Sequence, residues 1–420
     1  MDIIEKIKPL MKNIFSIIFV FLIFVFCNSS FAQPSFIFGK QLGTNKDDSG
    51  QDIVTYPSGD FVLAGTTFGS LYSDILGQSD GFIIKYDSTG NEIWKKQFGT
   101  KDKDRVWKLK KDINGNLYAA GNTYGTINGE QYGNQDMFIY KFDPNGKLIK
   151  SKIIGTDSTD YLSEIYIDDR LNIYIAGNTK GKLGSNSYGN WDYFIIKLDS
   201  NFNKIHTFQF GTDKRDYCRD FKIDKNGDVY ICGYTMGDLG RKNIGKTDAF
   251  IAKYSKQGKL IKIWQFGTNQ YDDVSRLLID KNENIYLAGT SFGNIVSRNK
   301  GKEDVFLMKL DNDWKIIWEK QYGTPSWDEA WAMELIKSDT ELLISGSSNP
   351  DAYLRLYDKY GNLKWNEVFA AKGKKAGTGG RHFAVYKSKY IYFTGFTFAD
   401  LFRKNLNQET DDAFIVKLGL

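Results

Sequence analysis

A period of 56 residues is the sequence feature that most constrains the fold of this chain. The segments DMFIYKFDPNGK, DYFIIKLDSNFN and DAFIAKYSKQGK follow one another at that interval. The aspartate that opens each such segment recurs at Asp80, Asp136, Asp192, Asp248, Asp304, Asp351 and Asp412. A fixed period of this kind is typical of architectures in which each unit packs only on its neighbours. The chain is therefore interpreted as a row of seven alike units.

Each unit is predicted to form four short strands. In the second unit these strands cover 105–111, 117–123, 136–142 and 148–154, and the turns DINGN and DPNGK separate the first two and the last two. Asn-Gly and Asp-x-x-Gly turns between short apolar runs are strong hairpin signals. The second and third strands are apolar on both faces, so copies of the same sheet must cover them from both sides. Such a four-stranded antiparallel sheet is a propeller blade.

The two ends of the chain are predicted to share one blade. The fourth strand follows only the first six units, and the chain ends on a third strand, DAFIVKLGL. An unassigned fourth strand, SFIFGKQLG, runs from Ser35 to Gly43. Its pairing into the last sheet would close the ring and remove free sheet edges. The fold prediction is therefore an all-β, seven-bladed propeller formed as a single domain by residues 33–420.

Residues 1–32 are predicted to be a secretory signal peptide. An apolar run from Ile14 to Phe26 precedes the small-residue cleavage triplet Ser30-Phe31-Ala32. Met11 is an alternative start, and Cys27 offers a lipoprotein alternative, although Phe26 before it is unsuited to that cleavage. We therefore expect export to the periplasm, the outer surface or the medium. After cleavage the chain is expected to have no membrane span, and the protein is expected to be a monomer.

Charge and rare residues exclude several functions. The net charge is only +5, from 56 basic and 51 acidic residues, which lacks the basic excess of a nucleic-acid-binding protein. Two histidines leave little for histidine-based acid/base catalysis. Cys218 and Cys232 are predicted to face Thr235 and Phe221 on opposite sides of a hairpin, so no disulfide is expected between them.

The second unit resembles the bacterial SBBP-type β-propeller repeat. The segments NGNLYAAGNTYG and DMFIYKFDPNGKLIK carry the phrases GN-x-Y-x-x-G-x-T and D-x-F-x-x-K-x-D-x-x-G of that family. The resemblance covers residues 35–420 and implies an exported propeller, but it implies little about activity. The phrase YDSTGNEIW is also similar, more weakly, to quinoprotein propeller repeats.

Recurring aspartates at the start of the first strands are predicted to be structural. They are Asp48, Asp104, Asp160, Asp216, Asp272 and Asp328, with Thr378 in the seventh unit. A residue needed by every blade is expected to accept backbone N–H groups at the blade-to-blade turn. The turns DKNGD, DINGN and DKNEN contain part of a calcium-loop pattern but lack its final glutamate, so calcium in one or two of them is the minor alternative to plain Asx turns. No other cofactor is predicted.

Residues that differ between blades are the candidates for ligand binding. Three positions after the recurring aspartate stand Gln51, Trp107, Ser163, Arg219, Ser275, Trp331 and Arg381. One position further stand Asp52, Lys108, Glu164, Asp220, Arg276, Ala332 and His382. Because the first strand should be innermost, one of these sets is expected at the mouth of the central channel, where Trp107, Arg219 and Trp331 can grip a sugar, a peptide or an anion. In the alternative, the charges pair across blades and the tryptophans are packed.

The sixth unit departs from the pattern. Its loop before the third strand shrinks to SSNP, and the following blade connection lengthens to AAKGKKAGTGGRHF. This basic connection carries Lys372, Lys374, Lys375 and Arg381, and it is predicted to dock an acidic partner beside a notch in the ring. A solvated linker is the alternative.

Taken together, these features predict a non-catalytic binding or scaffolding protein for a protein, peptide or glycan partner. The alternatives are a propeller enzyme, such as a hydrolase, lyase or quinone-dependent dehydrogenase, and a cell-surface adhesin.

Overall fold

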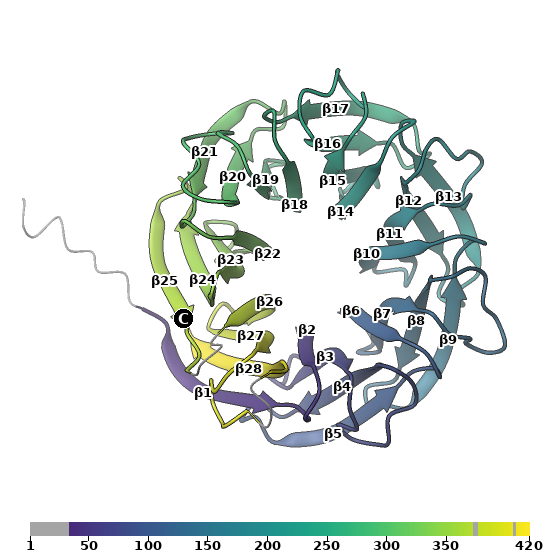
Figure 1. The fold of residues 1–420 in the computed structure, drawn as a ribbon, viewed down its shortest axis with the longest axis vertical. Helices are drawn as coiled ribbons and strands as arrows, with labels where there is room; N and C mark the ends of the chain where they lie inside the picture. The colour runs from purple at the N-terminus through teal and green to yellow at the C-terminus, as the bar shows by residue number, and fades with distance from the viewer. Residues whose placement is uncertain (1–32, 373–376, 406–408) are drawn as a thin grey trace, which may run out of the picture. The chain divides into compact units, whose positions relative to one another are not determined.

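Seven four-stranded antiparallel sheets stand around a central axis (Figure 1). The computed structural model describes residues 33–372, 377–405 and 409–420, and in them the chain forms 28 strands. The predicted signal peptide lies outside the described residues. The described part of the chain contains no helix with the length and hydropathy of a membrane span. The predicted seven-bladed, all-β propeller is confirmed.

Four strands, named a to d from the axis outward, make each blade. Strand a is β2 (Asp48–Thr55), β6 (Asp104–Lys111), β10 (Asp160–Ile167), β14 (Asp216–Ile223), β18 (Asp272–Ile279), β22 (Asp328–Ile336) and β26 (Thr378–Tyr386). Strand b is β3 (Phe61–Thr67), β7 (Leu117–Thr123), β11 (Ile173–Thr179), β15 (Val229–Thr235), β19 (Ile285–Ser291), β23 (Glu341–Ser348) and β27 (Tyr390–Thr397). Strand c is β4 (Asp80–Tyr86), β8 (Asp136–Phe142), β12 (Asp192–Leu198), β16 (Asp248–Tyr254), β20 (Asp304–Leu310), β24 (Asp351–Asp358) and β28 (Asp412–Gly419). Strand d is β5 (Glu92–Phe98), β9 (Leu148–Ile154), β13 (Lys204–Phe210), β17 (Leu260–Phe266), β21 (Ile316–Tyr322), β25 (Leu363–Phe369) and β1 (Ser35–Leu42).

The apolar core lies between blades rather than inside any one of them. Strands b and c are buried along almost their whole length, because the sheets on either side cover both of their faces. Seven clusters of buried side chains in the described residues correspond to the seven junctions of neighbouring blades. At the junction of the last and first blades, for example, Phe61 packs against Tyr392 in a tilted arrangement with ring centroids 4.6 Å apart.

The ring closes through the N-terminal strand, as predicted. Strand β1 pairs antiparallel with β28, from Ser35 opposite Gly419 to Leu42 opposite Ala413, and the two strands lie side by side at the rim in Figure 1. Gln41 on β1 binds the loop of the last blade: its amide nitrogen donates to Asp412 at 2.8 Å, and its oxygen accepts the N–H of Leu401 at 3.0 Å. Gln97 forms the same contacts within the first blade, which shows that β1 acts as a true strand d.

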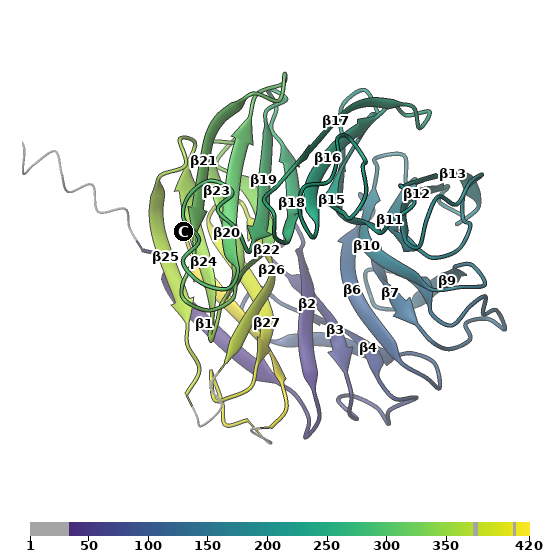
Figure 2. The ribbon, with the colours of Figure 1, turned by 45° about the horizontal axis from the view of Figure 1, so that its top comes forward.

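Strand a carries a β-bulge at the same place in every blade. The register against strand b shifts between the third and fifth residues of the strand, for example between Val106 and Lys108. The residues left without a partner are Gln51, Trp107, Ser163, Arg219, Ser275, Trp331 and Arg381. A bulge turns its side chain away from the regular alternation of the strand. Figure 2 shows strands β2 and β6 running beside the central axis, into which these side chains can project.

The bulge also corrects the predicted register of the cysteines. Cys232 lies opposite Asp220, one residue from its predicted partner, because the turn pairs Ile223 with Val229. Cys218 lies opposite Gly233, two residues from its predicted partner, because the bulge at Arg219 shifts the register by one more residue. Both thiols are buried and unbonded, so the expectation of no disulfide between them is confirmed.

The contribution of the closing strand to stability can be tested by substituting Gln41. The variant Gln41→Ala leaves the carboxylate of Asp412 and the backbone N–H groups of Leu401 and Phe402 without this partner, and we expect the free energy of unfolding to fall by about 1–3 kcal/mol. Thermal unfolding followed by circular dichroism measures the change. The variant Ile37→Ala is the control, since it truncates an exposed side chain on the same strand. Equal losses in the two variants would show that the Gln41 contacts do not hold the closing strand.

Candidate central binding site

A cavity of about 350 Å³ occupies the centre of the ring. We call it the central cavity, and its lining residues are Gln51, Trp107, Lys108, Leu162, Ser163, Arg219, Arg276, Trp331, Arg381 and His382. Six of the seven bulge residues are among them, from six different blades. The bulge is therefore the local feature that directs a different side chain from each blade into one space.

The cavity opens toward the face of the ring that carries the b–c loops and the blade connections, here called the loop face. These two kinds of segment meet there in short parallel bridges, such as Ser79 with Lys103 and Trp191 with Arg215. A smaller cavity of about 200 Å³ continues from the central cavity to this face, sharing Gln51, Trp107 and Arg381 with it.

A network of buried charges forms the floor of the central cavity. Lys108 on β6 donates to Glu164 on β10 at 2.8 Å, and Lys110 lies 3.1 Å from the other oxygen of the same carboxylate. On the other side, His382 Nδ1 lies 2.7 Å from Asp52 Oδ1. The second oxygen of Asp52 accepts the N–H of Leu109 at 2.8 Å. These contacts join blades seven, one, two and three, so the network holds the inner strands in fixed positions.

The charges in this network shift one another's pKa values. Burial alone would raise the pKa of Glu164, but the ammonium groups of Lys108 and Lys110 outweigh it and hold that pKa well below its ordinary value of 4.5. Burial opposes ionisation of Asp52 in the same way, and the charges of His382 and Lys110 lower its pKa in spite of it. Both carboxylates are therefore ionised at neutral pH.

Arginine and tryptophan side chains make the walls above this floor. The guanidinium of Arg381 lies over the ring of Trp331 at 4.1 Å and over that of Phe396 at 5.0 Å. Within the described residues, its buried Nε donates no hydrogen bond. The indole N–H of Trp331 donates to Glu329 at 3.1 Å, and that of Trp107 donates to Asn122 at 3.1 Å. Both indole N–H groups thus have hydrogen-bond acceptors, and the aromatic rings themselves remain as part of the cavity wall.

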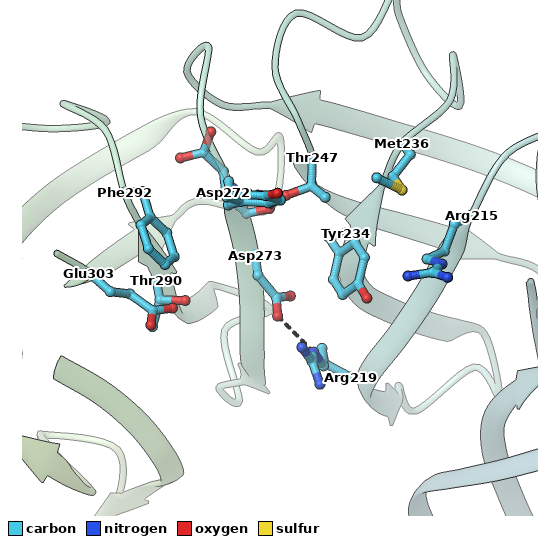
Figure 3. A pocket seen from close by; sticks show the side chains of 11 residues that line it. Arg215, Arg219, Tyr234, Met236, Thr247, Asp272, Asp273, Thr290, Phe292 and Glu303 are labelled. Carbon is cyan, nitrogen blue, oxygen red and sulfur yellow. Dashed lines mark hydrogen bonds and ion pairs between the residues drawn. The ribbon is translucent and has the colours of Figure 1, made fainter. Parts of the chain in front are cut away.

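A crevice between blades four and five adjoins the central cavity. It has a volume of about 410 Å³ and shares Arg219 with that cavity. Arg219 on β14 is ion-paired with Asp273 on β18 at 2.7 Å (Figure 3). In that view Tyr234 and Phe292 lie on either side of Asp273, and Arg215 and Glu303 lie at the two ends of the crevice. We call this space the blade 4–5 crevice.

Acidic groups with raised pKa values surround the opening. Burial raises the pKa of Glu303 to about 7, and the charges of Glu329 and Asp273 add to this against a lowering by Thr290 and Arg219. Burial, together with Asp47, also raises the pKa of Asp411 to about 7. Such carboxyl groups hold a proton over much of the range in which an ordinary glutamate or aspartate is charged.

The structure separates the candidate residues into two groups. Trp107, Arg219, Trp331 and Arg381 line the central cavity together. Lys372 is elsewhere, its backbone paired with Asp400 in an isolated bridge. Lys374 and Lys375 lie outside the described residues. The basic docking loop therefore stays a prediction, and Arg381 belongs to the channel rather than to that loop.

Sequence reasoning missed part of the site. It treated the bulge residues and the residues after them as competing sets, whereas Arg276 and Lys108 line the cavity beside the bulge residues. The crevice residues Tyr234, Arg215 and Glu303 come from strands b, a blade connection and a b–c loop, and no single period aligns them. Polar or charged residues at two consecutive positions of strand a, such as Trp107-Lys108 and Arg381-His382, are the signal that could have revealed the bulge, because both members of each pair line the cavity.

The six recurring aspartates hold the blade connections. The Oδ2 atom of each accepts the backbone N–H of a threonine four residues earlier, at 2.5 to 2.7 Å, and also the hydroxyl of that threonine. Burial raises the pKa of Asp48 to about 6, against the lowering effect of its hydrogen bonds from Thr67 and Thr44. These side chains face the connections rather than the central cavity.

The turns in which calcium binding is the minor alternative are the a–b turns DKNGD, DINGN and DKNEN, whose aspartates are not the recurring ones of strand a. In the DKNGD turn Asp224 Oδ1 accepts the N–H groups of Asn226 and Asp228, and its Oδ2 lies 3.0 Å from Lys253. Asp112 and Asp280 form equivalent Asx turns. Among the described residues, no group of three or more His, Cys, Asp or Glu side chains is placed to hold a metal ion. Calcium binding stays an untested prediction.

Comparison with known proteins places the repeat in a family. Residues 262–295, from strand d of blade four to strand b of blade five, match the model of the SBBP β-propeller repeat. The chain carries an SBBP β-propeller repeat. The resemblance predicted from the second unit is thereby confirmed.

Other relatives are distant. The regulatory protein FlaEY of Caulobacter vibrioides is 23% identical over 238 residues, which are 48% of this chain and 25% of that protein. This chain thus matches only about a quarter of the length of that curated relative. Polysaccharide lyase Uly1 is similar in structure, with a TM-score of 0.55, 9% identity, and 92% of this chain and 100% of that one covered. The Dos1 propeller has a TM-score of 0.50 at 12% identity, over 91% and 95% of the two chains. Both structural likenesses show the fold alone.

The charged floor predicts a pH-dependent stability. The lowered pKa of Glu164 stabilises the folded protein fully above the ordinary value of 4.5, and this contribution is lost as the pH falls through the lower pKa of the folded state. In Glu164→Gln the largely buried ammonium of Lys108 loses its counter-charge, while Lys110 keeps Asp52 at 3.9 Å, so we expect a loss of about 3 kcal/mol at pH 7. The loss should shrink as the pH falls below 4.5.

Thermal unfolding midpoints between pH 3 and pH 7 measure this effect. The control is Glu92→Gln, because Glu92 forms an exposed pair with Lys95. A midpoint difference between Glu164→Gln and wild type that does not change over this pH range would contradict the role given to the Glu164 charge.

Proposed function

We propose that this protein is a non-catalytic binding protein whose central cavity holds an anionic group of its ligand. One observation carries the proposal: the described residues lining the cavity include four cations but no aspartate or glutamate. Lys108 and Arg219 are paired with Glu164 and Asp273 behind the lining, whereas Arg276 and Arg381 form no ion pair in the described residues. Clefts lined by one sign of charge concentrate ligands of the opposite sign.

Two of these arginines are suited to a direct contact with an anion. Arg276 donates to the backbone carbonyls of Trp331 and Ser275 rather than to a carboxylate, so its charge is not cancelled by those contacts. The Arg381 guanidinium lies over the Trp331 ring at 4.1 Å, while its Nε is buried without an acceptor in the described residues. A guanidinium held in place in this way binds carboxylate, sulfate or phosphate oxygens with little loss of side-chain entropy.

The size and rigidity of the cavity support binding of a small group. Its volume of about 350 Å³ is at the lower end of the roughly 300–1,000 Å³ usual for ligand pockets. The charge network beneath it fixes the inner strands, so the arginines are preorganised before the ligand arrives. Trp107 and Trp331 provide flat apolar surfaces for a ring that carries the anionic group.

An enzyme is the second candidate, favoured by one observation. Glu303 and Asp411 have pKa values raised to about 7 at the opening of the cavity, and perturbed carboxyl groups near a cleft are typical of acid/base catalysts. A change of the bound ligand into new products on prolonged incubation, abolished in Glu303→Gln, would favour this candidate over simple binding.

Export belongs to the same proposal. The charged, apolar and small-residue segments of residues 1–32 are the support for it. Amino-terminal sequencing of the protein recovered outside the cytoplasm is expected to start at Gln33. A start at Cys27 would replace this prediction by the lipoprotein alternative, and recovery only in the cytoplasm would refute export.

Anion binding can be tested with a matched pair of sugars. We expect the wild-type protein to bind galacturonate more tightly than galactose, because only the former carries a carboxylate. The substitution Arg381→Gln should weaken galacturonate binding about tenfold or more, since hydrogen bonds to charged groups contribute roughly 1.5–3 kcal/mol. Isothermal titration calorimetry measures both affinities.

The control is Arg170→Gln, an exposed arginine in an a–b turn, on the other face from the cavity opening. Equal affinity for the two sugars, or an unchanged affinity in Arg381→Gln, would refute the proposed role of the cavity.

A further inference from the structure

Three cavities on the loop face form one continuous line through shared residues. The blade 4–5 crevice and the central cavity share Arg219. The central cavity and the smaller cavity between blades seven, one and two share Gln51, Trp107 and Arg381. The line therefore crosses the mouth of the ring from one side to the other, well beyond the size of a single small ligand.

Aromatic rings and cations alternate along this line. The crevice has Tyr234 and Phe292 beside Arg215 and Arg219 (Figure 3). The central cavity has Trp107 and Trp331 beside Arg381. In the third cavity the lining residues that continue this pattern are Phe68, Phe396 and Arg105.

The polar groups between these rings suit hydroxyl groups. Thr290 offers a hydroxyl in the crevice, where the Thr247 hydroxyl is already bonded to the backbone of Asp272. Gln51 and Ser49 offer an amide and a hydroxyl near the third cavity. Ser49 already accepts from the Gln51 amide at 2.8 Å, which leaves the amide oxygen of Gln51 for a ligand. Flat aromatic faces with scattered hydrogen-bonding groups fit the apolar face and the hydroxyl rim of a sugar ring.

The charge along the line is suited to a repeated anion. In the crevice the pair of Arg219 and Asp273 is neutral, while Arg215 is exposed and forms no ion pair with an acidic side chain in the described part of the chain. Burial raises the pKa of Glu303 to about 7, so this carboxyl holds a proton below that pH and adds no repulsion there. Each cavity presents at least one arginine, although Asp272 and Asp273 also line the crevice and Asp47 and Asp411 also line the third cavity. Burial raises the pKa of Asp411 to about 7. Successive anionic groups of one chain can meet successive arginines along this line.

We propose that the blade 4–5 crevice is a second binding site and that the three cavities together hold one acidic oligosaccharide, a chain of sugar rings that bear carboxylate or sulfate groups. This assignment rests on the proposed function, because the central cavity holds the middle of the chain. An acidic peptide is the competing occupant, and its side chains would not stack on the aromatic faces that the three cavities present.

The test is a titration with galacturonate oligomers of one to six rings. We expect the affinity to rise with length up to about three rings, one for each cavity, and then to level off. Arg215→Gln should weaken trimer binding about tenfold, since a charged hydrogen bond is lost, while monomer binding in the central cavity stays unchanged. Arg170→Gln is the matched control, and circular dichroism verifies that each variant is folded.

Two further arms identify the anion and the occupant. Sulfated oligosaccharides of matched length distinguish sulfate from carboxylate recognition, and either result supports the assignment. Poly-aspartate of matched charge tests the peptide. Tighter, length-dependent binding of poly-aspartate than of both kinds of acidic oligosaccharide would overturn the carbohydrate assignment.

The outcomes separate this inference from the proposed function. Monomer binding that is lost in Arg381→Gln, with no gain from added rings, would overturn the second site but keep the central one. An absence of binding by every acidic sugar and peptide would overturn both.

Discussion

Packing between neighbouring blades is the interaction on which the rest of the structure depends. Strands b and c are apolar on both faces, and only the next sheet on each side can bury them. An open row of seven blades would leave one apolar face exposed at each end. The pairing of β1 with β28 removes that problem, and Gln41 repeats in the closing blade the contacts that Gln97 makes in the first one.

Because every blade must pack on its neighbours, some positions carry the same residue type in nearly all blades, while others can vary. The recurring aspartates and the glycine-rich turns serve every blade, so they are the same in nearly all of them. The bulge residue of strand a varies between blades, and six of the seven line the central cavity, although Trp107 also packs against the apolar cluster between blades two and three. The serines at this position hold carbonyls of the next blade, as Ser163 does with Cys218 at 2.7 Å, while tryptophans and arginines face the cavity. Function in such a ring is set by the few inner positions that the fold does not constrain.

The sequence was sufficient to predict the ring but only part of the site. The period, the turn residues and the unassigned strand at Ser35–Gly43 predict blade number and closure, because they reflect local hairpin chemistry and a repeated core. The bulge was not predicted, since it depends on how strand a meets the channel. Together with a turn that pairs Ile223 with Val229, it places Cys218 two residues from its predicted partner. The blade 4–5 crevice was not predicted either. Arg219 and Asp273 come from different blades, and their pairing is a tertiary contact that no repeat in the sequence encodes.

The closing strand also constrains the order of events in folding. Ser35 and Gly419 pair although they are 384 positions apart in the sequence, so the last sheet cannot be completed before β28 has been synthesised. Pairing of such remote segments is entropically costly and slow. Until this pairing forms, only six blades have their strand d and the ring stays open. Apolar side chains near β28 and β2 then remain exposed, and other chains or chaperones can bind them. A protein of this architecture is therefore most exposed to aggregation in the interval between the synthesis of β28 and its pairing with β1.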